Sequence, residues 1–206
     1  MFKTKTRKVI LALALIAVLA LGGTLAYLSV ETKPINNQFT FIGAGQDGID
    51  AVLFEPNWDP ATALNLAPNA VVKKDPTVGN TGAIDIYTAI KVEFLDGNNK
   101  LLSDDDMLQF LRLVTLNNYG RNGWRLCLKP GAKASMTWYF TVPLQKGFAT
   151  QPLFDSVTVN KANSNADMEF LKKLGLNIRV TGAGVQGSAF ASANEASNDL
   201  YALLNP

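Results

Sequence analysis

Residues 84–94, Ile84-Asp85-Ile86-Tyr87-Thr88-Ala89-Ile90-Lys91-Val92-Glu93-Phe94, interleave apolar and polar side chains along one uninterrupted segment. Alternation of this kind is typical of a β-strand that buries one face and exposes the other. The turn-forming residues Asp96-Gly97-Asn98-Asn99 follow it. The segment therefore predicts a half-buried strand, and the rest of the chain can be compared with this pattern.

Strand signals of the same kind recur on both sides of this segment. They cover Gln38–Ile42, Ile49–Phe54, Val71–Val78, Gly123–Leu128, Ser135–Val142, Phe154–Val159 and Asn177–Val180. Many short strands separated by Gly, Pro and Asn turns are typical of sandwiches and jelly rolls. The sequence thus predicts an all-β fold, a jelly-roll β-sandwich with a few peripheral helices.

Three segments have helical signals. Ser103 can cap a helix that begins with Asp104-Asp105-Asp106 and continues to Leu113. Asn165 can cap Ala166–Leu174, with Gly175 as the stop, and Ser192–Glu195 has the pattern of a capping box before Ala196–Leu204.

Two connecting segments also carry turn or loop chemistry. Lys129-Pro130-Gly131 is typical of a type II turn between two strands. Residues 55–70 contain three prolines and little periodicity, which predicts a long surface loop anchored by Trp58.

The N-terminus has the layout of a secretory signal. Basic residues precede the apolar run Val9–Leu21, and a small-residue exit follows with Thr24 and Ala26. We expect cleavage after Ala26, so that Tyr27 becomes the first residue. The domain prediction is therefore a signal peptide over 1–26 and a single domain over 27–206. An uncleaved N-terminal anchor is the alternative.

Composition weighs against several classes of function. Four of the 19 basic residues lie in the expected signal, which leaves 15 against 17 acidic residues and no basic face for nucleic acid. The chain has no histidine and a single cysteine, Cys127, so the commonest general base, the commonest zinc ligand and an intrachain disulfide are all missing. Cys127 is interpreted as a buried small hydrophobe.

No catalytic or metal-binding constellation emerges from the remaining motifs. Asp104-Asp105-Asp106 lacks the spacing of a calcium loop and fits a helix N-terminus. The glycine-rich stretches Gly43–Gly48 and Gly182–Gly187 lack the context of a phosphate loop, so the first is expected to be a hairpin loop and the second a strand end or crossing loop. We therefore expect no catalytic residue, no metal and no cofactor, and a protein that is not an enzyme.

Several motifs, in order along the chain, resemble the TasA/camelysin family. They are Ala26–Ser29 followed by Asn37–Gly43, then Glu55–Pro60, Leu66–Asn69, Lys74–Gly82 with Tyr87, Thr150–Val157 and Gly184–Phe190. The first pair is similar to the cleavage region of SipW-type signals. The resemblance implies a jelly-roll domain exported by Gram-positive bacteria and assembled into extracellular fibres of the biofilm matrix or cell surface. Camelysin has been described as a metalloprotease, and the absence of histidine argues against that activity here.

The partners that this interpretation implies are further copies of the chain, a signal peptidase of SipW type and accessory matrix proteins. We expect head-to-tail assembly in which an extended N-terminal segment, containing Phe39, Phe41 and Ile42, is added as a donor strand to the sheet of a neighbour. Alternatively, Gln38–Ile42 forms the first strand of its own domain. A monomeric surface adhesin or carbohydrate-binding jelly roll is the alternative function.

Overall fold

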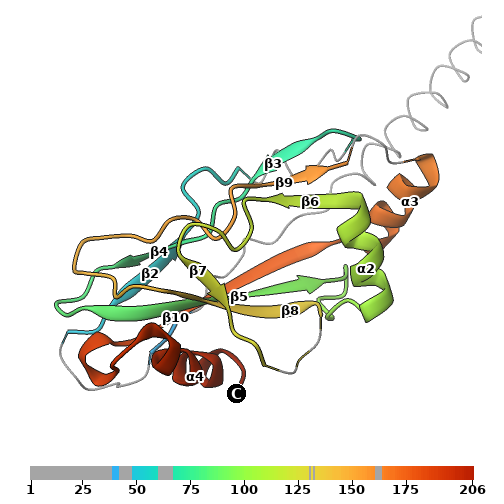
Figure 1. Ribbon diagram of the computed structural model, residues 1–206. Coiled ribbons are helices and arrows are strands. Elements are labelled where there is room, and N and C mark those ends of the chain that lie inside the picture. Colours follow the sequence, from blue (N-terminus) through green and yellow to red (C-terminus); the bar gives the residue numbers. More distant parts are fainter. Residues whose placement is uncertain (1–38, 42–47, 60–66, 130, 132, 161–163) are drawn as a thin grey trace, which may run out of the picture.

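The computed structural model describes residues 39–41, 48–59, 67–129, 131, 133–160 and 164–206. Within these residues strands predominate, and the helices lie in the second half of the chain (Figure 1). The elements are β1 (Phe39–Phe41), β2 (Ala51–Phe54), β3 (Val71–Lys73), β4 (Thr77–Asn80), β5 (Ile86–Leu95), α2 (Asp104–Leu113), β6 (Val114–Asn117), β7 (Trp124–Leu126), β8 (Ser135–Phe140), β9 (Ser156–Val159), α3 (Asn165–Leu174), β10 (Asn177–Gln186), the 3₁₀ helix η2 (Gly187–Ala189) and α4 (Ala193–Leu204).

The strands form three sheets. The largest has the order β1-β10-β5-β8-β7, and all its pairs are antiparallel except the parallel pair of β1 with β10. A three-stranded sheet has the order β3-β9-β6, and β2 pairs with β4 in a two-stranded sheet. The two smaller sheets face the largest one across the core (Figure 1). The expected all-β sandwich is therefore seen at the level of a β-rich, layered fold.

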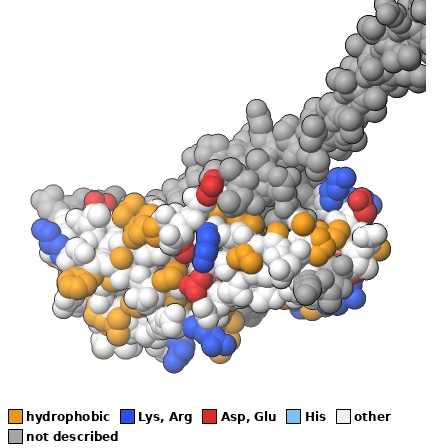
Figure 2. All heavy atoms as spheres, turned by 90° about the horizontal axis from the view of Figure 1, so that it is seen from above, with side chains coloured by type: hydrophobic (Ala, Val, Ile, Leu, Met, Phe, Trp, Pro, Cys, Tyr) orange, Lys and Arg blue, Asp and Glu red, His pale blue; other side chains and the backbone are white. Residues whose placement is uncertain are grey.

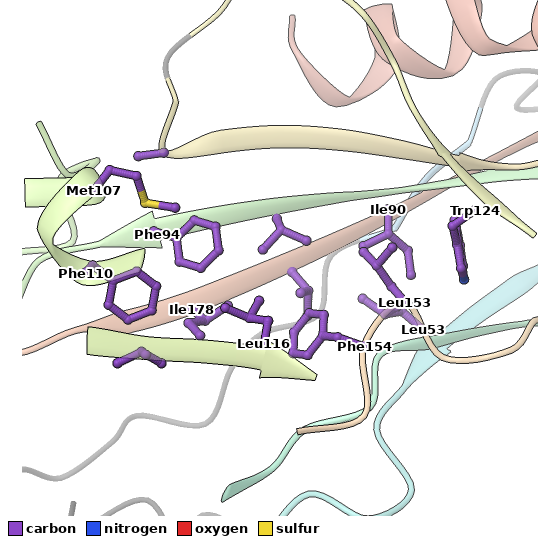
Figure 3. Close-up of a cluster of buried hydrophobic side chains, with 14 of the residues drawn as sticks. Leu53, Ile90, Phe94, Met107, Phe110, Leu116, Trp124, Leu153, Phe154 and Ile178 are labelled. Atoms are coloured by element: carbon purple, nitrogen blue, oxygen red, sulfur yellow. The ribbon is translucent and has the colours of Figure 1, made fainter. Parts of the chain in front are cut away.

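The core lies between these layers. One face of β5 contributes Ile86, Ile90, Val92 and Phe94, all fully buried. Figure 3 shows Ile90 and Phe94 of β5 among side chains from α2, β6 and the segment before β9. Trp124, Phe110 and Phe154 are the largest of the other fully buried side chains. Because burial of such side chains is the main favourable term in folding, this contact holds the layers together.

The outer face of the largest sheet is covered by α4. Tyr87 and Ala89 of β5, together with Ala183 of β10, pack against Ala196 and Leu200 of the helix. The expectation of a half-buried β5 is therefore wrong, because this helix covers the face that would otherwise meet water. Small residues on both elements allow the helix to approach the strands closely.

Two strand boundaries differ from the sequence prediction. The expected strand Val71–Val78 is two strands in different sheets, because Lys74-Asp75-Pro76 interrupts it and proline cannot donate to a ladder. The last strand does not end at Val180 but continues to Gln186, so Gly182–Gln186 is the second half of β10 and Gly187 begins η2. Of the two expectations for Gly182–Gly187, a strand end or a crossing loop, the structure shows the strand end.

All three expected helices are present. Ser103 caps α2 by accepting from the Asp106 N–H, as predicted. Ser164 caps α3, not Asn165, and it forms a reciprocal capping box with Asp167. Gly175 ends this helix in a left-handed conformation with φ 58°, as its sequence position indicated.

The third helix begins slightly earlier than expected. Ser192 caps α4 by accepting from the Glu195 N–H, but the Glu195 carboxylate accepts from the N–H of Ala191. The predicted capping box is therefore replaced by a contact one residue upstream.

Candidate assembly site

The predicted site residues fall at the N-terminal boundary of the described chain. Thr24, Ala26 and Tyr27, at the expected cleavage site, lie outside the described residues, and so does Ile42. Phe39 and Phe41 lie in β1, for which the structure gives the backbone pairing. Within this chain β1 pairs with β10, which matches the alternative in which this segment is the first strand of its own domain.

The pairing of β1 with β10 is short and parallel. Phe39 lies opposite Gly182, and Phe41 lies opposite Gly184. β1 is the terminal strand of its sheet, and no strand of the described residues pairs with its other side. A three-residue edge strand is held by few ladder hydrogen bonds.

The glycines of β10 contribute to this pairing. A Cβ on Gly184 would lie 3.4 Å from Cδ1 of Ile86, which places that position on the core side of the sheet. Because a glycine fills no space beside its neighbour, the strand paired with it can carry a large residue at that position.

β10 is held on its other side by a long antiparallel ladder. It pairs with β5 along all ten of its residues, from Asn177 opposite Leu95 to Gln186 opposite Ile86. The exposed outer face near its start carries an ionic group, in which Arg179 Nε lies 2.8 Å from Glu93 Oε2. Lys91 Nζ lies 3.2 Å from the other Glu93 oxygen and donates to the carbonyl of Leu204, which ties the end of α4 to the sheet.

A buried ion pair joins the segment after β2 to the segment after β3. Lys74 Nζ lies 2.8 Å and 3.0 Å from the two carboxylate oxygens of Glu55, and the two side chains are 3% and 5% exposed. The Trp58 ring covers the ammonium at 4.8 Å from its centroid. Burial lowers the pKa of Lys74, and the Glu55 carboxylate offsets only part of that effect.

A second contact in the same place uses a carboxylate. Asp75 accepts from both the backbone N–H and the side-chain amide of Asn57, at 3.0 Å and 2.6 Å. Trp58 thus anchors its loop as predicted, through Lys74 rather than through the apolar core. The charged side chains of this cluster pair with one another or with Asn57, so the contacts observed are structural ones.

The structure also places the residues for which the sequence predicted no catalytic or metal-binding role. Asp104, Asp105 and Asp106 lie in the first turn of α2, where the sequence placed them. Cys127 is buried, and burial raises the pKa of its thiol to about 11. No group of three or more acidic, cysteine or histidine side chains in the described residues is arranged to hold a metal ion. Pro130 of the predicted turn and residues 43–47 of the first glycine-rich loop lie outside the described residues.

The upper face of the molecule carries no broad apolar surface in the part that can be seen. Figure 2 shows its hydrophobic side chains in separate groups with charged side chains between them. Such scattered exposure is normal for a globular protein.

Comparisons with known proteins give no relative: no family model, no curated protein and no solved structure matches this chain. Among the described residues, no helix has the length and apolar character needed to span a lipid bilayer.

Proposed function

We propose that this chain is an exported structural protein that assembles into extracellular fibres of the biofilm matrix or the cell surface. The resemblance of its motifs to the TasA/camelysin family supports this function. The same resemblance supports a jelly-roll arrangement of the layered β-fold. The signal-like N-terminus supports export, with cleavage after Ala26 by a signal peptidase of SipW type.

One observation carries the assembly mechanism. The N-terminal strand β1 is a short edge strand, joined to β10 by a parallel ladder at Phe39–Phe41. An edge strand at the end of a chain can leave its own sheet and add to the same edge of a neighbour. This contact is head-to-tail, and head-to-tail contacts that do not close into a ring produce filaments.

Deletion of residues 27–37 from the mature protein tests the mechanism. We expect the truncated protein to remain a folded monomer and to form no fibres, because a donor reduced to β1 only exchanges one three-residue ladder for an identical one and gains nothing by crossing to a neighbour. Electron microscopy and sedimentation over a range of concentrations measure this. Replacing the same residues with a flexible Gly/Ser segment of equal length is the matched control for chain length. Fibres of normal appearance from the truncated protein contradict the donor role.

Two further measurements test the wider proposal. N-terminal sequencing of secreted protein should begin at Tyr27, and recovery of an intact, membrane-retained N-terminus contradicts the cleaved signal. Full-length mature protein should sediment as larger species when its concentration rises. A protein that stays monomeric at every concentration would instead favour the adhesin or carbohydrate-binding function.

A further inference from the structure

The buried pair of Glu55 and Lys74 places an amine directly against a carboxylate, with water excluded from both. Lys74 Nζ lies 2.8 Å and 3.0 Å from the two oxygens of Glu55, and the side chains are 3% and 5% exposed. The carboxyl carbon Cδ lies between those oxygens, so it is within about 3.5 Å of the nitrogen, the separation of a near-attack pair. The two atoms that an amide bond would join are therefore already close together.

The surroundings of this pair favour its neutral form. The Trp58 ring covers the amine at 4.8 Å from its centroid, and burial lowers the pKa of Lys74. Moving one proton from Nζ to the adjacent carboxylate removes both charges, which a site without water favours. The result of that transfer is a nucleophilic amine beside a carboxylic acid.

We propose that Lys74 and Glu55 condense into an amide within the chain, with the loss of one water molecule. A proton first passes from Nζ to a Glu55 oxygen, and the amine lone pair then attacks Cδ. The bond from Cδ to the hydroxyl oxygen breaks, and the hydroxyl takes a second proton from nitrogen and leaves as water. The third hydrogen of the ammonium stays on the amide nitrogen, so the step needs no oxidant, metal or further reactant.

A second carboxylate is fixed beside the reacting amine. Asp75 accepts from the backbone N–H and the side-chain amide of Asn57, at 3.0 Å and 2.6 Å, and its charge interacts with Lys74. While nitrogen attacks Cδ it carries a developing positive charge, which a fixed negative charge stabilises. Asp75 is therefore a positioning and electrostatic group of this site, and Glu55 and Lys74 are its reactants.

Two further lysine–carboxylate contacts in the described chain lack these conditions. Lys91 Nζ lies 3.2 Å from Glu93, but Arg179 holds the same carboxylate at 2.8 Å and lowers its pKa, so the acid form is disfavoured. Lys133 and Asp104 are 56% and 57% exposed, so water surrounds both groups. The burial and pairing needed for condensation come together at Glu55 and Lys74.

The amide would close the chain around β2 and β3. Its two residues lie nineteen positions apart, one directly after β2 and the other directly after β3, and these strands belong to different sheets. Such a closure restricts the unfolded chain as a disulfide does. The chain has one cysteine and can form no disulfide of its own, so an amide is its available covalent closure. The bond forms within one copy and does not depend on assembly into fibres.

Mass spectrometry of the unmodified, folded mature protein tests the proposal. We expect an intact mass below that of the sequence by one water. Because a succinimide at an Asp-Gly step loses water as well, the bond must also be located. Trypsin cuts between Lys73 and Lys74 and leaves Glu55 and Lys74 on different peptides. We expect these peptides to stay joined, with fragmentation placing the bond at Glu55 and Lys74.

Lys74→Arg is the matched control, because a guanidinium keeps the positive charge but does not form this amide. Its mass should equal that of its own sequence, and its two peptides should separate. Cleavage after Lys91, whose contact with Glu93 should not condense, is the control within each digest. The main measurement uses the unmodified protein and so does not depend on the folding of the variant.

The possible results separate the proposal from its alternatives. Full sequence mass and separate peptides in the folded protein overturn the amide and leave an ion pair. Loss of ammonia, with Lys74 joined to Asn57, overturns the assignment to Glu55. Loss of water without joined peptides places the change elsewhere and also overturns the proposal. None of these results bears on fibre formation, which electron microscopy measures separately.

Discussion

Removing the negative charge of Glu55 tests the structural role assigned to the buried ion pair. Glu55→Gln leaves Lys74 with an amide in place of a carboxylate, while both side chains remain shielded from water at 3% and 5% exposure. Breaking a buried pair in this way costs about 3–5 kcal/mol, because the Lys74 charge remains buried without its carboxylate partner. The loss is large beside a total stability of about 5–15 kcal/mol.

The double variant Glu55→Leu with Lys74→Met separates the charge from the packing. It removes both charges and keeps similar side-chain volumes, and such replacements are often neutral or stabilising by about 1–4 kcal/mol. We therefore expect the double variant to be clearly more stable than Glu55→Gln. The Trp58 ring, which covers the ammonium, can pack against the methionine instead.

Urea unfolding of the mature protein measures these effects. With a slope of about 2 kcal/mol per molar, a loss of about 3–5 kcal/mol moves the midpoint of Glu55→Gln down by about 1.5–2.5 M. Lys133→Gln, which removes an exposed pair with Asp104 at 3.3 Å, is the control and should change stability by less than about 1 kcal/mol. A Glu55→Gln shift as small as that of the control, or a double variant as unstable as the single one, would refute the reasoning.

Three further predictions follow from single positions. Gly120→Ala should destabilise the protein by at least about 2 kcal/mol in urea unfolding, because φ is +66° and the added Cβ would clash with the Trp138 ring. Gly147→Ala is the control: its φ of +78° is also positive, but the added Cβ meets no atom within 4 Å, so it should cost only about 1 kcal/mol. Cys127 should react with a thiol reagent at pH 8 at least about 100-fold more slowly in native than in urea-unfolded protein, since its pKa is raised from 9.0 to about 11; equal rates would contradict its burial. Burial alone would raise the pKa of Glu93, but its arginine and lysine partners outweigh this and lower it below 4.5. Its stabilising contribution is therefore present above that value and is lost as the pH falls through the native pKa, so Glu93→Gln should weaken the acid dependence of unfolding, and an unchanged dependence would contradict the assignment.

Local chemistry made several elements predictable from the sequence. The alternation of residues 84–94 correctly predicted β5, the central strand, because apolar residues at every second position share one face only when the segment is extended. Ser103 before three aspartates marked the start of α2, and Gly175 marked the end of α3, because caps act within one turn of the chain. Such signals depend on neighbouring residues alone.

Other features depended on contacts between distant residues. β6 follows α2 without a loop, and its alternating Val114-Thr115-Leu116-Asn117 could have indicated it. The second half of β10 was missed because Gly182 and Gly184 have low strand propensity, and only the adjacent strands explain their position.

The pairing of Glu55 with Lys74 is a similar case. The two residues lie nineteen positions apart in sequence, and no local rule links them. The strand at Phe39–Phe41 was therefore predictable from its own residues, whereas its pairing with β10 was not.

The exchange of β1 between subunits that we propose would have an energetic consequence for the fibre. The ladder at Phe39–Phe41 is the same whether it is made within one chain or between two, so exchanging it contributes no net hydrogen bond. Association meanwhile costs about 4–15 kcal/mol in translational and rotational freedom. Fibres are therefore stable only if the donor makes further contacts in the neighbour, or if the chain's own β1 is held under strain. Under the proposed mechanism such contacts would come from residues beyond Phe39–Phe41, so the length of the donor segment is the quantity that the deletion of residues 27–37 tests.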